Sequence, residues 1–185
     1  GHAQEWPAKP VRAVLPFAPG GSSEFMTRLI TDELTRRLKQ PFLMDSRPGA
    51  GGVIGMDLVA KAPADGYTLA ISGIAPLIIA PAMNPAGFDA MKSFTHIALF
   101  GGAPEMIVLH PSVPVRNVKE LLAYAKAQPR GFSYASAGVG TKGHLLGELF
   151  IELSSANMVH IPYKGGGPAI ADLVANQVPS SCLLY

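Results

Sequence analysis

Two glycine-rich segments contain the residues with the clearest capacity for chemistry. The first, 16–23, is Pro-Phe-Ala-Pro-Gly-Gly-Ser-Ser, and the second, 136–141, is Ser-Ala-Gly-Val-Gly-Thr. Glycine lets a ligand approach the backbone closely. Where a helix begins at such a segment, its first N–H groups are unpaired and lie at the positive end of the helix dipole. Each segment is therefore a candidate anion site that needs no basic side chain.

A second interpretation applies to each segment alone, because glycine and serine are also ordinary turn and N-cap residues. Two similar joints in one chain favour the binding interpretation.

Three side chains near the joints each allow a functional and a structural interpretation. Phe17 either covers a ligand's carbon skeleton or belongs to the core. Glu24 complements the helix dipole, partners a cap at Gly21 or Ser22, or accepts a hydrogen bond from a ligand at the pocket mouth. His144 lines a pocket or faces solvent.

The elements that position both joints follow from the hydrophobic pattern. Strands are predicted at 11–17, 42–44, 67–72, 106–109, 132–136 and 158–161. Helices are predicted over 25–38, 53–62, 117–127 and 145–153, and a further one from Pro168. This alternation indicates an α/β fold with mainly parallel, helix-covered strands, whose ligands bind beyond the carboxyl ends of the strands. Gly101–Pro104 predicts a flexible joint between two lobes, 1–103 and 104–185.

Composition restricts the class of protein. The chain has 185 residues, of which 48% are apolar and 15% charged, so it is expected to fold. The net charge of +2 is scattered along the chain, which argues against nucleic-acid binding. Cys182 is the single cysteine, which excludes an internal disulfide and a cysteine-based zinc site. No apolar run approaches the ~18 residues of a membrane span.

A dinucleotide site is the main enzymatic alternative, because residues 138–143 satisfy G-x-G-x-x-G between a predicted strand and helix. The acidic residue expected at the end of the next strand is absent, although Lys164 is able to meet a 2′-phosphate. The missing acidic residue therefore weakens the hypothesis of an NADP-dependent enzyme but does not exclude it. The signatures G-x-S-x-G, G-x-x-x-x-G-K-[ST] and H-E-x-x-H are absent. The histidines at 96, 110, 144 and 160 show no metal-ligand spacing, so we expect no enzyme, metal or cofactor.

Seven segments together resemble the Bug-type periplasmic solute receptors, the substrate-binding proteins of tripartite tricarboxylate transporters. They are Trp-Pro-Ala-Lys-Pro (6–10), Pro-Phe-Ala-Pro-Gly-Gly-Ser (16–22), Asp-Ser-Arg-Pro-Gly-Ala-Gly-Gly (45–52), Ala-Lys-Ala-Pro-Ala-Asp-Gly-Tyr-Thr-Leu (60–69), Ser-Tyr-Ala-Ser-Ala-Gly (133–138), Gly-His-Leu with Gly-Glu-Leu-Phe (143–150) and His-Ile-Pro-Tyr-Lys-Gly (160–165). The resemblance implies a periplasmic-binding-protein-like two-lobe (flytrap) fold of type II. It also implies an exported periplasmic protein, its signal peptide removed, that captures a small organic carboxylate for the membrane subunits of a transporter.

The resemblance also implies a set of ligand-binding residues. Carboxylates are expected to be held largely by backbone amides, often through water, and the G-x-G-x-x-G match becomes a coincidence of turn chemistry. Tyr163 and Lys164 are expected to act through backbone groups. The complete expected set is Phe17, Pro19, Gly20, Gly21, Ser22, Ser23, Glu24, Ser72, Gly73, Ala137, Gly138, Gly140, Thr141, His144, Tyr163 and Lys164.

Two departures from the family pattern affect these expectations. Family members commonly have aspartate where Glu24 stands, which leaves the ligand's identity open. The family chain is also longer, and the strand after Gln177 contains Pro179 and lacks the usual acidic residue. We therefore expect an incomplete fold whose exposed apolar surface favours dimers, strand exchange or poor solubility. A receptor that signals to a membrane sensor kinase, or the effector-binding domain of a transcription regulator, are further alternatives from the sequence.

Overall fold

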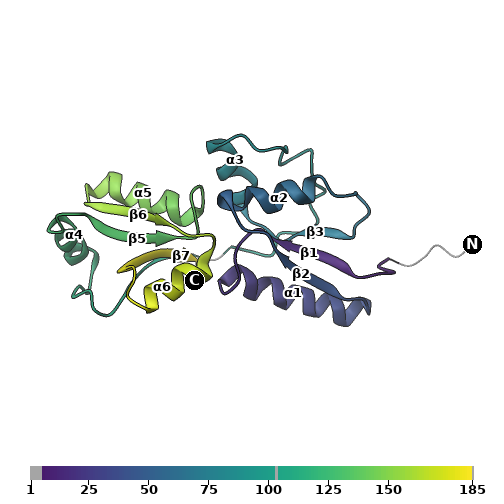
Figure 1. Cartoon of the computed structure of the whole chain (residues 1–185), viewed down its shortest axis with the longest axis horizontal. Coiled ribbons are helices and arrows are strands. Elements are labelled where there is room, and N and C mark those ends of the chain that lie inside the picture. The colour runs from purple at the N-terminus through teal and green to yellow at the C-terminus, as the bar shows by residue number, and fades with distance from the viewer. Residues whose placement is uncertain (1–5, 103, 185) are drawn as a thin grey trace, which may run out of the picture.

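Two β-sheets, each covered by helices, lie next to each other along the long axis of the protein (Figure 1). The structure is a computed structural model that describes residues 6–102 and 104–184. The expected lobe boundary at residue 103 lies outside the described residues. The strand–helix alternation expected from the sequence is present, and it places one group of elements before this point and a second group after it.

The first sheet has the strand order β2-β1-β3, and all its described strands are parallel. Its strands are β1 (Val11–Leu15), β2 (Phe42–Ser46) and β3 (Thr68–Ala70). Helices α1 (Ser22–Leu38) and α2 (Val53–Ala60) cover opposite faces of this sheet (Figure 1). The central strand β1 is buried on both faces, which explains its nearly continuous apolar sequence.

The second sheet has the strand order β4-β7-β5-β6, with β4 antiparallel to β7 and the other pairs parallel. Its strands are β4 (Glu105–Leu109), β5 (Phe132–Ser136), β6 (Met158–Pro162) and β7 (Ser180–Leu184). Its helices are α4 (Val118–Lys126), α5 (Lys142–Ser154) and α6 (Gly166–Val174). Helices α5 and α6 lie on opposite faces of the sheet (Figure 1).

Buried apolar side chains of the second lobe form two clusters. One cluster joins α6 to the centre of the sheet and contains Ala135, Ala169, Leu173, Val178 and Leu183. The other lies under α4 and contains Val113, Leu121, Ala125 and Phe132. Asn117 caps the start of α4, because the Glu120 N–H donates to Asn117 Oδ1 at 3.0 Å. Large apolar side chains are exposed on both lobes, including Leu99 and Leu153; the oligomeric state stays a prediction.

Several element boundaries differ from the sequence expectations. The first strand ends at Leu15, so Phe17 belongs to the loop. Helix α6 begins at Gly166, two residues before Pro168. The sequence pattern did not predict the helical segment formed by η2 (Ala75–Ile79) and α3 (Ala80–Met83). Pro76 lies in the first turn of this segment, and Pro81 lies where η2 passes into α3.

Pro179 causes no defect in the second sheet, because it lies just before β7. Its carbonyl accepts a hydrogen bond from the His110 N–H at 2.9 Å, and pairing of β7 with its neighbours begins at Ser180. Cys182 is buried within β7. No helix among the described residues combines the length and the apolar content needed to cross a bilayer.

Candidate functional site

Four strand–helix joints, two from each lobe, line a shared cleft of about 220 Å³. The joint after β1 contributes Phe17, and the joint after β2 contributes Gly49–Gly52. From the other lobe, the joint after β5 contributes Ala137–Val139 and the joint after β6 contributes Pro162–Lys164. All four follow the carboxyl ends of parallel strands, which is where open α/β sheets bind ligands.

The lobes touch through backbone at the glycines beside this cleft. The Ala18 N–H donates to the Lys164 carbonyl at 2.9 Å. A Cβ on Gly20 would lie 3.2 Å from Gly167 Cα, and a Cβ on Gly51 would overlap the Val139 carbonyl. These glycines therefore let the two lobes approach each other, in addition to any role in binding.

The first joint uses one of its amides within the protein. The Gly20 N–H donates to Glu24 Oε2 at 2.6 Å, and Arg28 pairs with Glu24 Oε1 at 2.6 Å. The hydrogen bond from Gly20 lowers the pKa of Glu24, and Arg28 lowers it further. Glu24 thus stabilises the start of α1 with its own negative charge, as the dipole-complementing interpretation expected. The start of α1 also packs against the start of α6 instead of that of α5.

The second joint is also bonded internally, through a hydroxyl, a ring nitrogen and a carbonyl. The Gly138 N–H donates to Ser136 Oγ at 3.1 Å, and the Gly140 N–H donates to His144 Nδ1 at 3.2 Å. The Thr141 hydroxyl donates to the Gly138 carbonyl at 2.6 Å. Behind this joint, burial lowers the pKa of His160 to about 4, and nearby His144 acts in the same direction. The joint is therefore a turn closed by hydrogen bonds to its own neighbouring side chains.

The structure brings five of the expected ligand-binding residues to the lining of the cleft: Phe17, Ala137, Gly138, Tyr163 and Lys164. Pro19, Gly20 and Gly21 lie where α1 meets α6, and Ser22 and Ser23 begin α1. Thr141 is buried at the start of α5.

The third joint, after β3, and His144 lie outside the lining residues of the cleft. Ser72 Oγ is buried and has no hydrogen-bond partner among the described residues. A Cβ on Gly73 would meet nothing within 4 Å. His144 neither lines this cleft nor simply faces solvent, because its ring stacks on His160 with centroids 4.3 Å apart.

The sequence analysis did not include Gly49–Gly52, Val139 and Pro162 among the site residues, although they line the cleft. A signal for the first of these was available. Residues 47–52 form a glycine-rich segment directly after a strand, as the two selected joints do. Gly49, Gly51 and Gly52 all have positive φ angles, which explains the run of glycines there.

The lining of the cleft carries little charge. Lys164 supplies the one basic side chain among the described lining residues. The Tyr163 hydroxyl donates to Asp172 Oδ2 at 2.6 Å, and burial together with this bond raises the pKa of Tyr163 to about 12. The four joints, with one basic residue (Lys164) and one phenylalanine (Phe17) among the lining residues, therefore suit a small anion with an apolar body.

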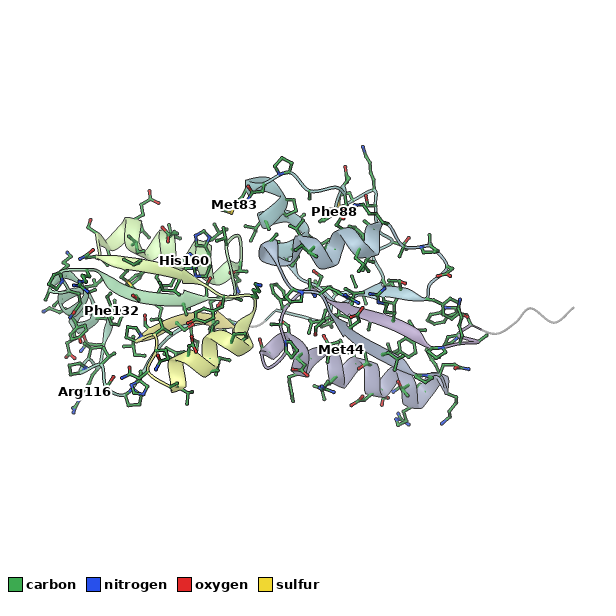
Figure 2. All side chains as sticks on the ribbon, in the orientation of Figure 1. Met44, Met83, Phe88, Arg116, Phe132 and His160 are labelled. Atoms are coloured by element: carbon green, nitrogen blue, oxygen red, sulfur yellow. The ribbon has the colours of Figure 1, made fainter. Side chains whose placement is uncertain are left out.

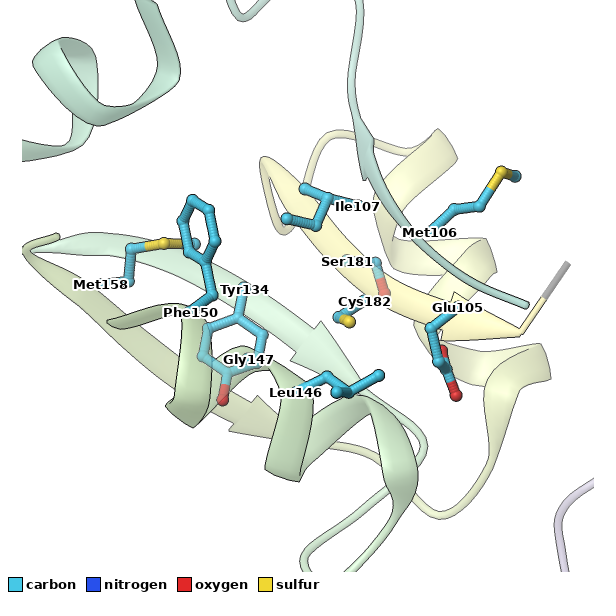
Figure 3. A pocket seen from close by; sticks show the side chains of 10 residues that line it. All are labelled: Glu105, Met106, Ile107, Tyr134, Leu146, Gly147, Phe150, Met158, Ser181 and Cys182. Carbon is cyan, nitrogen blue, oxygen red and sulfur yellow. The ribbon is translucent and has the colours of Figure 1, made fainter. Parts of the chain in front are cut away.

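A second cavity, of about 150 Å³, lies inside the second lobe between α5 and the strands β4, β5 and β7 (Figure 3). Its lining is mainly apolar and includes Met106, Leu146 and Phe150. Glu105 also reaches it, and burial raises the pKa of this carboxyl group. Burial likewise raises the pKa of the Cys182 thiol to about 11, so this thiol is not an activated nucleophile.

Comparison with known proteins decides the family. Residues 26–184 match the family described as tripartite tricarboxylate transporter family receptor. The chain belongs to this family. Protein BugT from Bordetella pertussis (strain Tohama I) is 38% identical over 178 residues, covering 95% of this chain and 55% of BugT. A protein encoded in the tcbD-tcbE intergenic region of Pseudomonas sp. (strain P51) is 34% identical over 173 residues, covering 94% of this chain and 52% of that protein. The chain thus spans about half the length of the curated relatives it matches.

Solved structures of this family share the fold. A periplasmic transporter has a TM-score of 0.92 and 36% identity, covering 96% of this chain and 60% of its own. An R. palustris protein with adipate has a TM-score of 0.87 and 32% identity, and the match covers 96% of this chain and 60% of that protein. MatC from Rhodopseudomonas palustris with bound malate has a TM-score of 0.88 and 31% identity, with 96% of this chain and 60% of MatC covered. These likenesses confirm the α/β periplasmic-binding-protein fold for this tripartite tricarboxylate receptor chain.

Proposed function

We propose that this chain captures a small organic carboxylate in the periplasm and presents it to the membrane subunits of a tripartite tricarboxylate-type transporter, without converting it chemically. One observation carries the proposal: joints at the carboxyl ends of strands from both lobes line one small cleft, and Lys164 is the one basic residue among its described lining residues. The relatives solved with adipate and with malate support the choice of ligand class.

The cleft supplies the parts that carboxylate capture requires. Lys164 contributes a positive charge, and charge-assisted hydrogen bonds to a carboxylate are worth about 1.5–3 kcal/mol each. Phe17 offers an apolar surface to the carbon skeleton of the ligand. A volume of about 220 Å³ suits a metabolite smaller than a drug-sized molecule.

The internal bonds of the glycine joints determine how their amides take part. Gly20, Gly138 and Gly140 already donate to Glu24, Ser136 and His144, respectively. A ligand carboxylate therefore reaches these amides by displacing a protein acceptor, or it interacts with them through an ordered water. Glu24 repels a carboxylate placed next to it, so the ligand's negative end is expected nearer to Lys164.

Thermal unfolding with and without candidate ligands tests this function. We expect malate or adipate to raise the melting temperature, because a ligand at 100 times its Kd adds about 2.7 kcal/mol to the free energy of unfolding. NADPH is expected to have no effect. A shift with NADPH and none with any dicarboxylate would overturn carboxylate capture and favour the enzymatic alternative.

A charge-removing variant locates the binding site. Lys164→Gln is expected to weaken dicarboxylate binding about tenfold or more, since it removes one charge-assisted hydrogen bond. The matched control is Lys126→Gln at the end of α4, which leaves the cleft unchanged. Equal affinities of the two variants in isothermal titration calorimetry would place the carboxylate elsewhere.

A further inference from the structure

Three side chains with metal-binding atoms lie close together beside the second joint, apart from the lining of the cleft. They are His144, Glu148 and His160, and one ligand atom from each lies within 4.8 Å of the other two. His144 and Glu148 lie one turn apart on α5, so they share a face of that helix. His160 comes from β6, next to α5 (Figure 2).

Partners outside the group orient two of its members. The Tyr134 hydroxyl donates to Glu148 Oε1 at 2.7 Å, which leaves Oε2 available. His160 Nε2 lies 2.7 Å from Ser136 Oγ, and this hydroxyl donates to the Gly138 carbonyl. This contact holds the His160 ring through Nε2, so Nδ1 is the ring atom left to bind a metal. Histidine ligands of metals are typically fixed in this way, through their second nitrogen.

His144 requires a rearrangement before it can bind a metal. Its ring lies over that of His160 with centroids 4.3 Å apart and planes inclined by 28°, so one ion cannot lie in both ring planes. Its Nδ1 accepts a hydrogen bond of 3.2 Å from the Gly140 N–H. Turning the His144 ring therefore costs one long hydrogen bond, while His160 and Glu148 stay in place.

We propose that His144, Glu148 and His160 bind a single divalent transition-metal ion of the Zn²⁺ class, with water in the remaining coordination position. Two imidazoles and one carboxylate form a donor set that Zn²⁺ commonly accepts. One carboxylate is too little oxygen for a Ca²⁺ or Mg²⁺ site. The competing arrangement is a purely structural stack of two histidines that binds no ion.

Metal binding has a consequence at the cleft. An ion bound at His144 Nδ1 occupies the lone pair that now accepts the Gly140 N–H. An ion bound at Nε2 instead requires the proton to lie on Nδ1, which then cannot accept. In both cases the Gly140 amide loses its acceptor. Gly140 belongs to the second joint, whose residues 137–139 line the cleft. Metal binding therefore alters the Gly140 amide directly, and this effect is independent of whether the cleft binds a carboxylate.

Calorimetric titration with Zn²⁺ alone, in the absence of any carboxylate, tests the site. We expect one ion per chain, and a weakening of at least about tenfold in His144→Gln and Glu148→Gln. His110→Gln is the matched control, since His110 is a half-buried histidine of the same lobe whose ring bonds to Ser112, outside this group. Binding that all four proteins share equally, or no saturable binding, would overturn the proposal.

A milder variant separates loss of the site from loss of the fold. Tyr134→Phe keeps the ring that packs against Gly147 and removes only the hydroxyl that orients Glu148. We expect it to weaken Zn²⁺ binding about 10- to 100-fold while its circular dichroism spectrum stays unchanged. In the unsubstituted protein, Zn²⁺ should shift the Gly140 amide signal in a ¹H–¹⁵N NMR spectrum. An unmoved Gly140 signal at saturation, or unchanged affinity in Tyr134→Phe, would rule out this site.

Discussion

The glycine joints of the two lobes differ in how they satisfy the same kind of backbone donor. In the first lobe the Gly20 N–H bonds to the carboxylate of Glu24, which also pairs with Arg28. In the second lobe, the N–H groups of Gly138 and Gly140 bond to the buried hydroxyl of Ser136 and to a ring nitrogen of the half-buried His144. A carboxylate on the first turn of a surface helix can move aside for a ligand or a water, whereas a fully buried hydroxyl such as that of Ser136 is part of the lobe's core. The first joint is thus adaptable and the second is rigid.

The largest effect is expected from filling the rigid joint. Gly138 has a φ of 134°, and a Cβ there would lie 2.8 Å from the Tyr163 carbonyl. Gly138→Val is therefore expected to abolish binding of malate or adipate in calorimetry, because it distorts two joints that line the cleft. Gly20→Val should also abolish binding, since its Cβ would press on Gly167.

Gly102→Val is the control for both valine variants, because a Cβ at Gly102 meets nothing within 4 Å. It should bind the dicarboxylate like the unsubstituted chain. Full affinity in both Gly138→Val and Gly20→Val would show that neither joint contributes to the ligand site.

Removing the buried acceptor of the second joint is expected to have the next largest effect. Ser136 is fully buried, and Ser136→Ala leaves the Gly138 N–H and His160 Nε2 without this partner. The free energy of unfolding should fall by about 1–3 kcal/mol, as measured by urea denaturation. Ser22→Ala, at the exposed joint, should change it by less than about 0.5 kcal/mol. Equal losses in both variants would contradict the difference between the joints.

The second lobe should also lose stability in mild acid. The pKa of His160 is 6.5 in an unfolded chain and about 4 in the folded protein, because burial disfavours the charged ring. Between these values the unfolded chain binds a proton that the folded protein rejects. This contribution is therefore fully present above pH 6.5 and is lost as the pH falls towards 4.

A variant without the imidazole tests that pH dependence. His160→Gln should show a shallower fall in urea midpoint between pH 6.5 and pH 4 than the unsubstituted chain. His110→Gln, elsewhere in the same lobe, should follow the unsubstituted chain. A parallel decline in all three proteins would mean that His160 does not cause the acid sensitivity.

Local patterns were sufficient to predict most of the strands and helices, because burial alternates with their periods. The central strand β1 and the capped helix α4 are examples. The segment Ala75–Met83 was not predicted, because it contains Pro76 and Pro81, and proline is unfavourable inside a helix but tolerated in its first turn. Propensity alone does not distinguish these two uses of proline.

The candidate site was predictable only in part, since its composition depends on how the lobes meet. Phe17 and Gly138 could be selected from the sequence because each lies in a glycine-rich joint. The pairing of α1 with α6 depends on contacts between residues about 145 positions apart, such as Gly21 and Gly166. The stack of His144 on His160 likewise joins a helix to a strand. Spacing within one element reveals neither contact.

The smallest expected effect is that of removing the charge at the adaptable joint. The pKa of Glu24 is lowered from 4.5, chiefly by the Gly20 N–H, so the carboxylate form stabilises the folded protein. That stabilisation is present above pH 4.5 and is lost as the pH falls through the folded-state pKa. Glu24→Gln should therefore lower the urea midpoint slightly at pH 7, by less than Ser136→Ala does, and the difference should shrink as the pH falls below 4.5.

Glu24→Gln also tests whether the first joint exchanges its partner with a ligand. The amide side chain still reaches Gly20 but no longer repels a carboxylate, so the affinity for a dicarboxylate should rise while stability falls slightly. Glu152→Gln, an exposed position on α5, is the control and should alter neither quantity. A loss of affinity in Glu24→Gln would mean that the carboxylate holds the joint in its binding shape. In that case the first joint would be as rigid as the second, and the contrast between a charged and a neutral acceptor would have no functional consequence.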